Sequence, residues 1–195
     1  MNYYKTTTWF FILWIIGASS FPVCLQAEPP VNPALTGEEK AANQNDPEIL
    51  DREAEAYQKR GKFNQAASLR KKALAIRKEA LGLDHPEVAR SLNNLGVVYL
   101  YLEKYAEAIP LFKRALETQD KQILHEHSEV ARTLNMLGAV YSFLGNYSEA
   151  EPYFRRTLEA PEEEMGMEHP DVATSLNNLA DLYHKQGNFA KAERL

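Results

Sequence analysis

One 15-residue segment occurs three times in the chain, at intervals of 42 residues. The copies read HPEVARSLNNLGVVY from His85, HSEVARTLNMLGAVY from His127 and HPDVATSLNNLADLY from His169. The first and third agree at ten of their fifteen positions. Such a period is typical of stacked supersecondary units, because one unit alone leaves its apolar face uncovered. The repeat therefore predicts a linear array of units.

Each unit contains two amphipathic stretches separated by a short turn, EKY, GNY or GNF. In the second unit, Val88, Leu92, Leu95 and Tyr99 are spaced by three or four residues, which places them on one helical face. The pattern predicts an all-α fold of antiparallel helix pairs, with three complete units and one incomplete unit. We place the array at residues 46–195 and its units at about 46–84, 85–126, 127–168 and 169–195.

Small and polar residues refine this prediction. Gly96 and Ala108 allow neighbouring helices to approach closely beside aromatic side chains, and Pro86 suits the first position of a helix. The first unit has Glu53 and Arg70 where later units have leucine and phenylalanine. Such polar replacements suit a terminal unit that caps the stack.

The order Leu95-Gly96, Tyr99, Ala108, Phe112 within a unit resembles the tetratricopeptide repeat. The 42-residue period and the segments DHPEVARSLNNLG and EHPDVATSLNNLA are similar to the kinesin-light-chain variety of that repeat. The resemblance covers residues 46–195. It implies a right-handed solenoid of antiparallel helix pairs whose concave groove receives an extended peptide or another protein, without catalysis.

The N-terminus predicts export. Residues 1–27 contain one lysine, a bulky apolar run and a Leu-Gln-Ala ending, the layout of a cleaved signal peptide. An uncleaved membrane anchor over residues 9–25 is the alternative, at the short limit for a bilayer span. Residues 28–45 are rich in proline, asparagine and charge and are predicted to be a flexible leader. The expected location is the bacterial periplasm or the exterior.

Charge and cysteine content exclude several functions. Removal of Lys5 with the signal changes the formal net charge from −5 to −6, which disfavours nucleic-acid binding. Cys24, the single cysteine, leaves with the signal, so the mature chain has no disulfide or thiolate chemistry. We predict no nucleic-acid partner.

The face of each first helix opposite the apolar stripe is the candidate partner-binding groove. It combines amide, cationic, apolar and aromatic side chains, which suit capture of a peptide backbone, a carboxylate and apolar anchors. The predicted groove residues are Arg90, Asn93, Asn94, Val97, Tyr101, Arg132, Asn135, Met136, Phe143, Asn177, Asn178 and Asp181.

A structural alternative stays open for several of these residues. The repeated Asn93, Asn135 and Asn177 could bridge adjacent first helices or satisfy neighbouring backbone groups. The arginines could be solvated or paired with nearby acids. Tyr101 and Phe143 could pack against another unit.

Other chemistry has weaker support. His125 and His127 have no third ligand nearby, so we predict no metal site and expect capping or solvated histidines. The acidic segment PEEEMGMEHPD lacks the ligand spacing of a calcium loop. Ser91 and Ser175 repeat in register as helix-face residues, and no glycine-rich phosphate loop occurs. We predict no cofactor and no catalytic residue.

The sequence thus predicts an exported scaffold or adaptor that binds a protein or extended peptide. The alternative is a regulatory repeat segment of a larger protein with a catalytic domain beyond Leu195. Self-association through the incomplete fourth unit is a third expectation.

Overall fold

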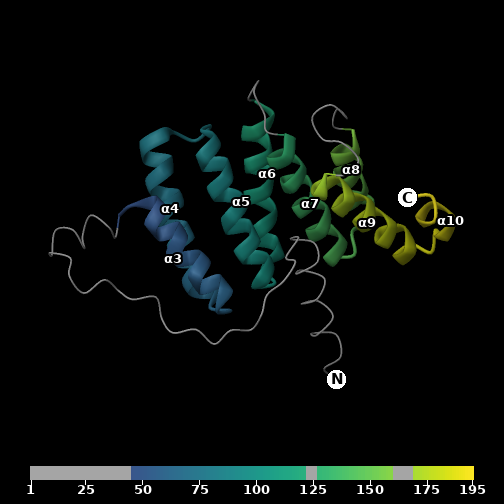
Figure 1. Cartoon of the computed structure of the whole chain (residues 1–195), viewed down its shortest axis with the longest axis horizontal. Coiled ribbons are helices and arrows are strands. Elements are labelled where there is room, and N and C mark those ends of the chain that lie inside the picture. The colour runs from purple at the N-terminus through teal and green to yellow at the C-terminus, as the bar shows by residue number, and fades with distance from the viewer. Residues whose placement is uncertain (1–44, 122–126, 160–168) are drawn as a thin grey trace.

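The computed structural model describes residues 45–121, 127–159 and 169–195, and this part of the chain contains eight helices and no strand (Figure 1). The all-α prediction is confirmed. The predicted signal and the leader, apart from its last residue, lie outside the described residues. The helices are α3 (Pro47–Lys59), α4 (Phe63–Leu81), α5 (Pro86–Tyr101), α6 (Tyr105–Asp120), α7 (His127–Phe143), α8 (Tyr147–Leu158), α9 (Pro170–Lys185) and α10 (Phe189–Ala192).

Repeated local signals start the first helix of a unit. A proline occupies the first turn of α3, α5 and α9, where its missing N–H has no intrahelical partner to lose. The preceding histidine caps α5 and α9. Nδ1 of His85 accepts from the Glu87 N–H at 3.2 Å, and Nδ1 of His169 accepts from the Asp171 N–H at 3.2 Å. Both histidines therefore cap their helices, whereas the capping role expected for His125 and His127 lies outside the described side chains.

The turn between the two helices of a unit requires a left-handed residue. Gly61, Gly145 and Gly187 occupy this position with φ of 70°, 76° and 74°. In the second unit the same position is Glu103, with φ of 57°. Only glycine adopts this conformation without a steric cost, so the EKY turn is the strained member of the set.

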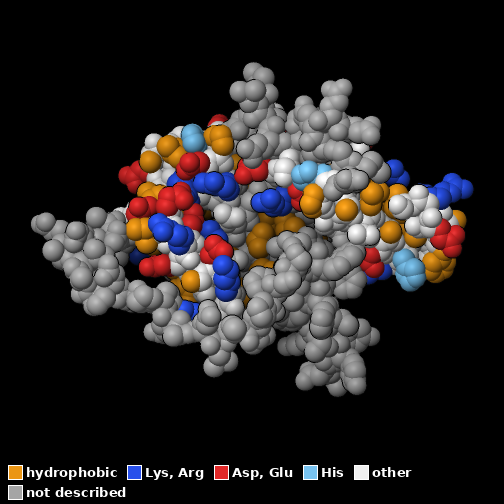
Figure 2. All heavy atoms as spheres, in the orientation of Figure 1, with side chains coloured by type: hydrophobic (Ala, Val, Ile, Leu, Met, Phe, Trp, Pro, Cys, Tyr) orange, Lys and Arg blue, Asp and Glu red, His pale blue; other side chains and the backbone are white. Residues whose placement is uncertain are grey.

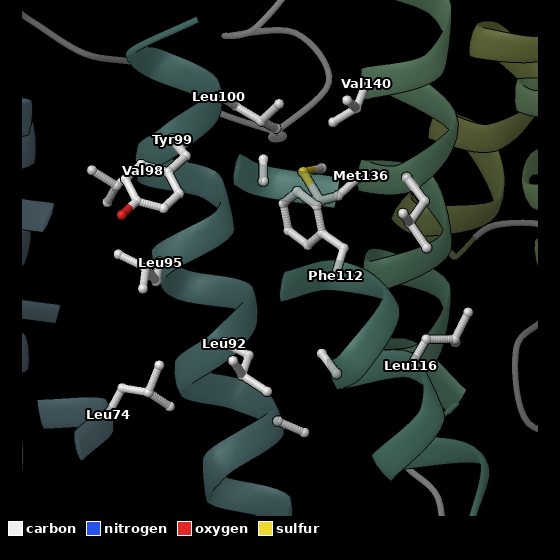
Figure 3. Close-up of a cluster of buried hydrophobic side chains, with 14 of the residues drawn as sticks. Leu74, Leu92, Leu95, Val98, Tyr99, Leu100, Phe112, Leu116, Met136 and Val140 are labelled. Atoms are coloured by element: carbon white, nitrogen blue, oxygen red, sulfur yellow. The ribbon is translucent and has the colours of Figure 1, made fainter. Parts of the chain in front are cut away.

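Glycine at the centre of α5 and α7 sets how closely the paired helices approach. A Cβ atom on Gly96 would lie 2.7 Å from the Phe112 ring, and one on Gly138 would lie 2.5 Å from the Phe154 ring. Figure 3 shows the Phe112 ring in the space between α5 and α7, beside Met136. The predicted close approach at Gly96 is confirmed, and Ala108 is fully buried.

The helix pairs stack in chain order to form the solenoid. Each helix packs against the next, and the first helices α5 and α7, and α7 and α9, also contact each other directly. Figure 1 shows the helices side by side along the long axis of the molecule. This right-handed tetratricopeptide-type arrangement places the first helices on one face and the second helices on the other.

The first unit differs from the others in its polar positions. Glu53 is exposed, as suits a terminal unit. Arg70 is only 9% exposed and forms hydrogen bonds to Asp51 and Gln58, so it does not face solvent as a capping residue would. The helices within the described residues include none that is long and apolar enough to cross a membrane.

Candidate partner-binding groove

A hollow of about 500 Å³ crosses the face made by the first helices. It reaches from Gln58 on α3 to Thr174 on α9, and Arg70 of α4 extends into its wall. Figure 2 shows a hollow with an apolar floor near the middle of the molecule and charged side chains beside it. A site of this volume accommodates a few residues of an extended peptide.

The middle of the groove combines an apolar floor with free polar groups. Val97 and Met136 line it from α5 and α7, and Asn94 and Arg132 lie beside them. Within the described part of the chain, Asn94 and Arg132 form no hydrogen bond or ion pair. These four predicted residues therefore lie together, and two of them keep their hydrogen-bonding capacity for a partner.

The repeated asparagines Asn93 and Asn135 serve the contacts between units. Asn93 Nδ2 donates to Thr133 Oγ1 at 2.6 Å, and Asn135 Nδ2 donates to the Asp171 carbonyl at 2.9 Å. Asn135 is only 1% exposed. These contacts favour the structural alternative for both residues. Asn177, at the same position of α9, is exposed.

Three predicted residues at the ends of the groove are either in ion pairs or buried. Arg90 is exposed and lies 3.9 Å from Glu48, a loose ion pair. Asp181 forms an ion pair with Lys185 at 2.7 Å. Asn178 is buried, and its Nδ2 has no hydrogen-bond partner. None of these three lines the central hollow.

Tyr101 and Phe143 pack against the preceding unit. The Tyr101 ring stacks on Phe63 with centroids 4.8 Å apart, and the Phe143 ring stacks on Tyr105 at 5.8 Å. Both are half-buried. The packing that the sequence left open for them is thus present, so neither ring is a free anchor pocket for a partner.

A buried ionic cluster at the first junction was not predicted from the sequence. Arg77 is 2% exposed and donates to Asp51 at 2.6 Å, to Glu48 at 2.5 Å and to Ser91 Oγ at 2.9 Å. Burial disfavours its charge, but hydrogen bonds to the two carboxylates outweigh that effect and raise the pKa of Arg77. The cluster holds α3 and α4 against α5.

The hydroxyls in register at 91, 133 and 175 are structural. All three are buried. Ser91 donates to the Glu87 carbonyl and Ser175 to the Phe154 carbonyl, at 2.9 and 2.8 Å. Among the described residues, the hydrogen-bond partners of these hydroxyls are backbone carbonyls, Arg77, Asn93 and Gln119, and none of them is a general base.

The prediction of no metal site concerned His125 and His127. His125 and the His127 side chain lie outside the described residues. Within the described segments, no group of three or more His, Cys, Asp or Glu side chains is arranged to hold a metal ion.

Comparison with known proteins identifies the repeat. The family model of the tetratricopeptide repeat matches this sequence at residues 47–121, 104–163 and 129–195. The chain belongs to the tetratricopeptide repeat family. Its structural neighbours include kinesin-light-chain-like repeat proteins, and tetratricopeptide repeat proteins bind other proteins or peptides and are typically non-catalytic.

Solved structures agree with this assignment. The chain is similar to BtubC (BKLC) from P. vanneervenii, with 28% identity and a TM-score of 0.68 over 76% of this chain. It spans 59% of the length of BtubC. A putative kinesin light chain from P. anserina shares the fold at 24% identity and a TM-score of 0.65, over 83% of this chain and 74% of that one. The search of curated proteins gave no match.

Proposed function

We propose that this chain is an exported scaffold that binds an extended peptide or protein segment in the groove between α3 and α9. The observation that carries the proposal is the combination of Asn94 and Arg132, which have no partners within the described residues, with the apolar floor of Val97 and Met136. An amide bonds to both the N–H and the C=O of an extended backbone, and a guanidinium bonds to a carboxylate.

In this proposal, Asn94 makes the contacts with the partner backbone that were predicted for the repeated asparagines. Asn94 takes the place of Asn93 as the amide that contacts the partner, because Asn93 is already bonded to Thr133. Arg132 is the principal cation, since Arg90 lies close to Glu48. The remaining predicted residues shape the groove or hold its helices together.

Photo-crosslinking tests groove binding. A photo-reactive phenylalanine analogue replaces Thr174, which lines the groove, in the full chain expressed in its native cell. We expect a crosslinked partner that is lost when Arg132→Glu is added. The matched control places the analogue at Lys72, an exposed position of α4. The same partner captured from Lys72, or retained with Arg132→Glu, would contradict the proposal.

Export rests on the N-terminal pattern and has its own test. The intact mass and the N-terminal peptide of protein from the native cell are measured. We expect a mature chain that begins at Glu28 and is recovered outside the cytoplasm. A chain that keeps residues 1–27 and fractionates with the membrane would favour the anchor, and a cytoplasmic chain would contradict export.

A further inference from the structure

A second hollow lies among the second helices, on residues that do not contribute to the groove. Its volume is about 520 Å³. Lys113 of α6, Tyr141 at the end of α7, and Pro152, Tyr153 and Arg156 of α8 form most of its wall. The Tyr141 and Tyr153 rings are nearly parallel, with centroids 5.7 Å apart and an interplanar angle of 6°.

The internal repeat shows that folding does not require this aromatic pair. The positions equivalent to Tyr153 in the other units are leucines, at 69, 111 and 195. Tyr99 and Tyr183, equivalent to Tyr141, are 9% and 2% exposed, whereas Tyr141 is half-buried. Tyr57, the equivalent residue of the first unit, is also half-buried. The third unit therefore departs from the repeat once at this place, through Tyr153, which adds aromatic surface beside Tyr141.

Two cations and one acid line the rim of the hollow. Lys113 Nζ lies 5.8 Å from the Tyr141 ring centroid. Arg156 is 45% exposed and donates to Asp120. The Glu149 carboxylate, which accepts from Ser148 at 2.9 Å, is the one acid among the residues that line the hollow. The rim therefore complements an acidic side chain.

We propose that this hollow binds an extended proline-rich segment of a partner protein, with an acidic side chain of that segment facing Lys113 and Arg156. Proline rings pack against aromatic faces, and a polyproline helix is already extended, so binding costs little ordering entropy. The backbone carbonyls of such a segment have no internal hydrogen bonds and accept from tyrosine hydroxyls.

The test uses the full chain and a fluorescein-labelled peptide Glu-Pro-Pro-Pro-Pro-Glu, with binding followed by fluorescence anisotropy. Tyr153→Leu installs the residue that the other units carry at this position, so the array should keep its fold, which circular dichroism checks. We expect this variant to bind roughly tenfold more weakly than the unaltered chain. Groove variants at Arg132 should bind the peptide unchanged, which separates this site from the proposed groove.

A charge swap tests the second half of the proposal. The unaltered chain should prefer the glutamate peptide over Lys-Pro-Pro-Pro-Pro-Lys, and Lys113→Glu should reverse that preference. Equal binding by the unaltered chain and Tyr153→Leu, no binding of the glutamate peptide by either, or a preference unaffected by Lys113→Glu would each overturn the proposal.

Discussion

Arg77 and Gln119 occupy the same position of successive units, and both contact a hydroxyl of the next first helix. Arg77 donates to Ser91 at 2.9 Å, and Gln119 Oε1 lies 2.9 Å from Thr133 Oγ1. Around Arg77, however, the contact extends to Asp51 and Glu48, whereas the hydrogen-bond partner of Gln119 among the described residues is the neutral hydroxyl of Thr133. The repeat therefore conserves the geometry of the junction while its chemistry changes from ionic to neutral.

The same contrast appears within the units, about two helix turns nearer the start of the second helix. Arg70 bonds Asp51 in the first unit, whereas Phe112 packs on Gly96 in the second. An ionic junction is sensitive to loss of one partner, because the remaining charge is left buried. An aromatic junction is sensitive to shape instead. Loss of a charged partner should therefore destabilise the ionic contacts of the first unit, whereas added volume should destabilise the aromatic contact of the second unit.

The largest expected effect is the loss of Arg77. Arg77→Ala removes a buried guanidinium and its hydrogen bonds to Asp51 and Ser91, although Asp51 keeps Arg70 at 2.7 Å, and we expect a loss of about 3 kcal/mol in the free energy of unfolding. Urea denaturation followed by circular dichroism measures it. Gln119→Ala, the matched control, should cost only about 1 kcal/mol. Equal losses at the two positions would remove the distinction between the junctions.

The next effect tests shape inside the second unit, where α6 packs against α5. Gly96→Ala places a methyl group against the Phe112 ring, and we expect destabilisation of about 1–3 kcal/mol despite the better helix propensity of alanine. The control is Ala180→Gly, at the equivalent position of α9, which should cost about 1 kcal/mol through propensity alone. A rise in the thermal midpoint of Gly96→Ala would show that the ring moves aside without cost.

A smaller effect distinguishes structural from binding asparagines. Asn93→Ala removes the donor to Thr133, and we expect a loss of about 1 kcal/mol in the free energy of unfolding. Asn177→Ala, at the equivalent but exposed position, should change stability by less than about 0.5 kcal/mol. Similar losses in both variants would show that the hydrogen bond from Asn93 to Thr133 adds no measurable stability.

The sequence predicted the all-α fold and the close packing at Gly96 because these depend on a periodic pattern repeated in several copies. It could not assign Asn93 and Asn94 to different roles. Adjacent helix residues point about 100° apart, and the neighbouring helix decides which one is covered. The ionic cluster of Arg77 was missed because its partners are brought together only by the stacking of three helices.

The contact between α8 and α9, which joins the third unit to the fourth, provides the test with the smallest expected effect. This contact is ionic but partly exposed. Tyr183 donates to Glu151 at 2.7 Å, and Arg155 donates to the same carboxylate at 2.8 Å. The hydrogen bond from Tyr183, and then the contacts of Arg155, hold the pKa of Glu151 below its ordinary value. Because the folded-state pKa is lowered, this stabilisation is present above the ordinary glutamate range and is lost as the pH falls through the lowered value.

Glu151→Gln should therefore be less stable than the unaltered chain by less than about 1 kcal/mol at neutral pH, since solvent screens the carboxylate. The difference between the two should disappear in acid, where both side chains are neutral. Thermal unfolding over a pH series from about 7 down to about 2 follows the difference, and acid effects elsewhere cancel in the subtraction. A difference that stays constant with pH would show that packing, and not charge, joins α8 to α9 at this residue.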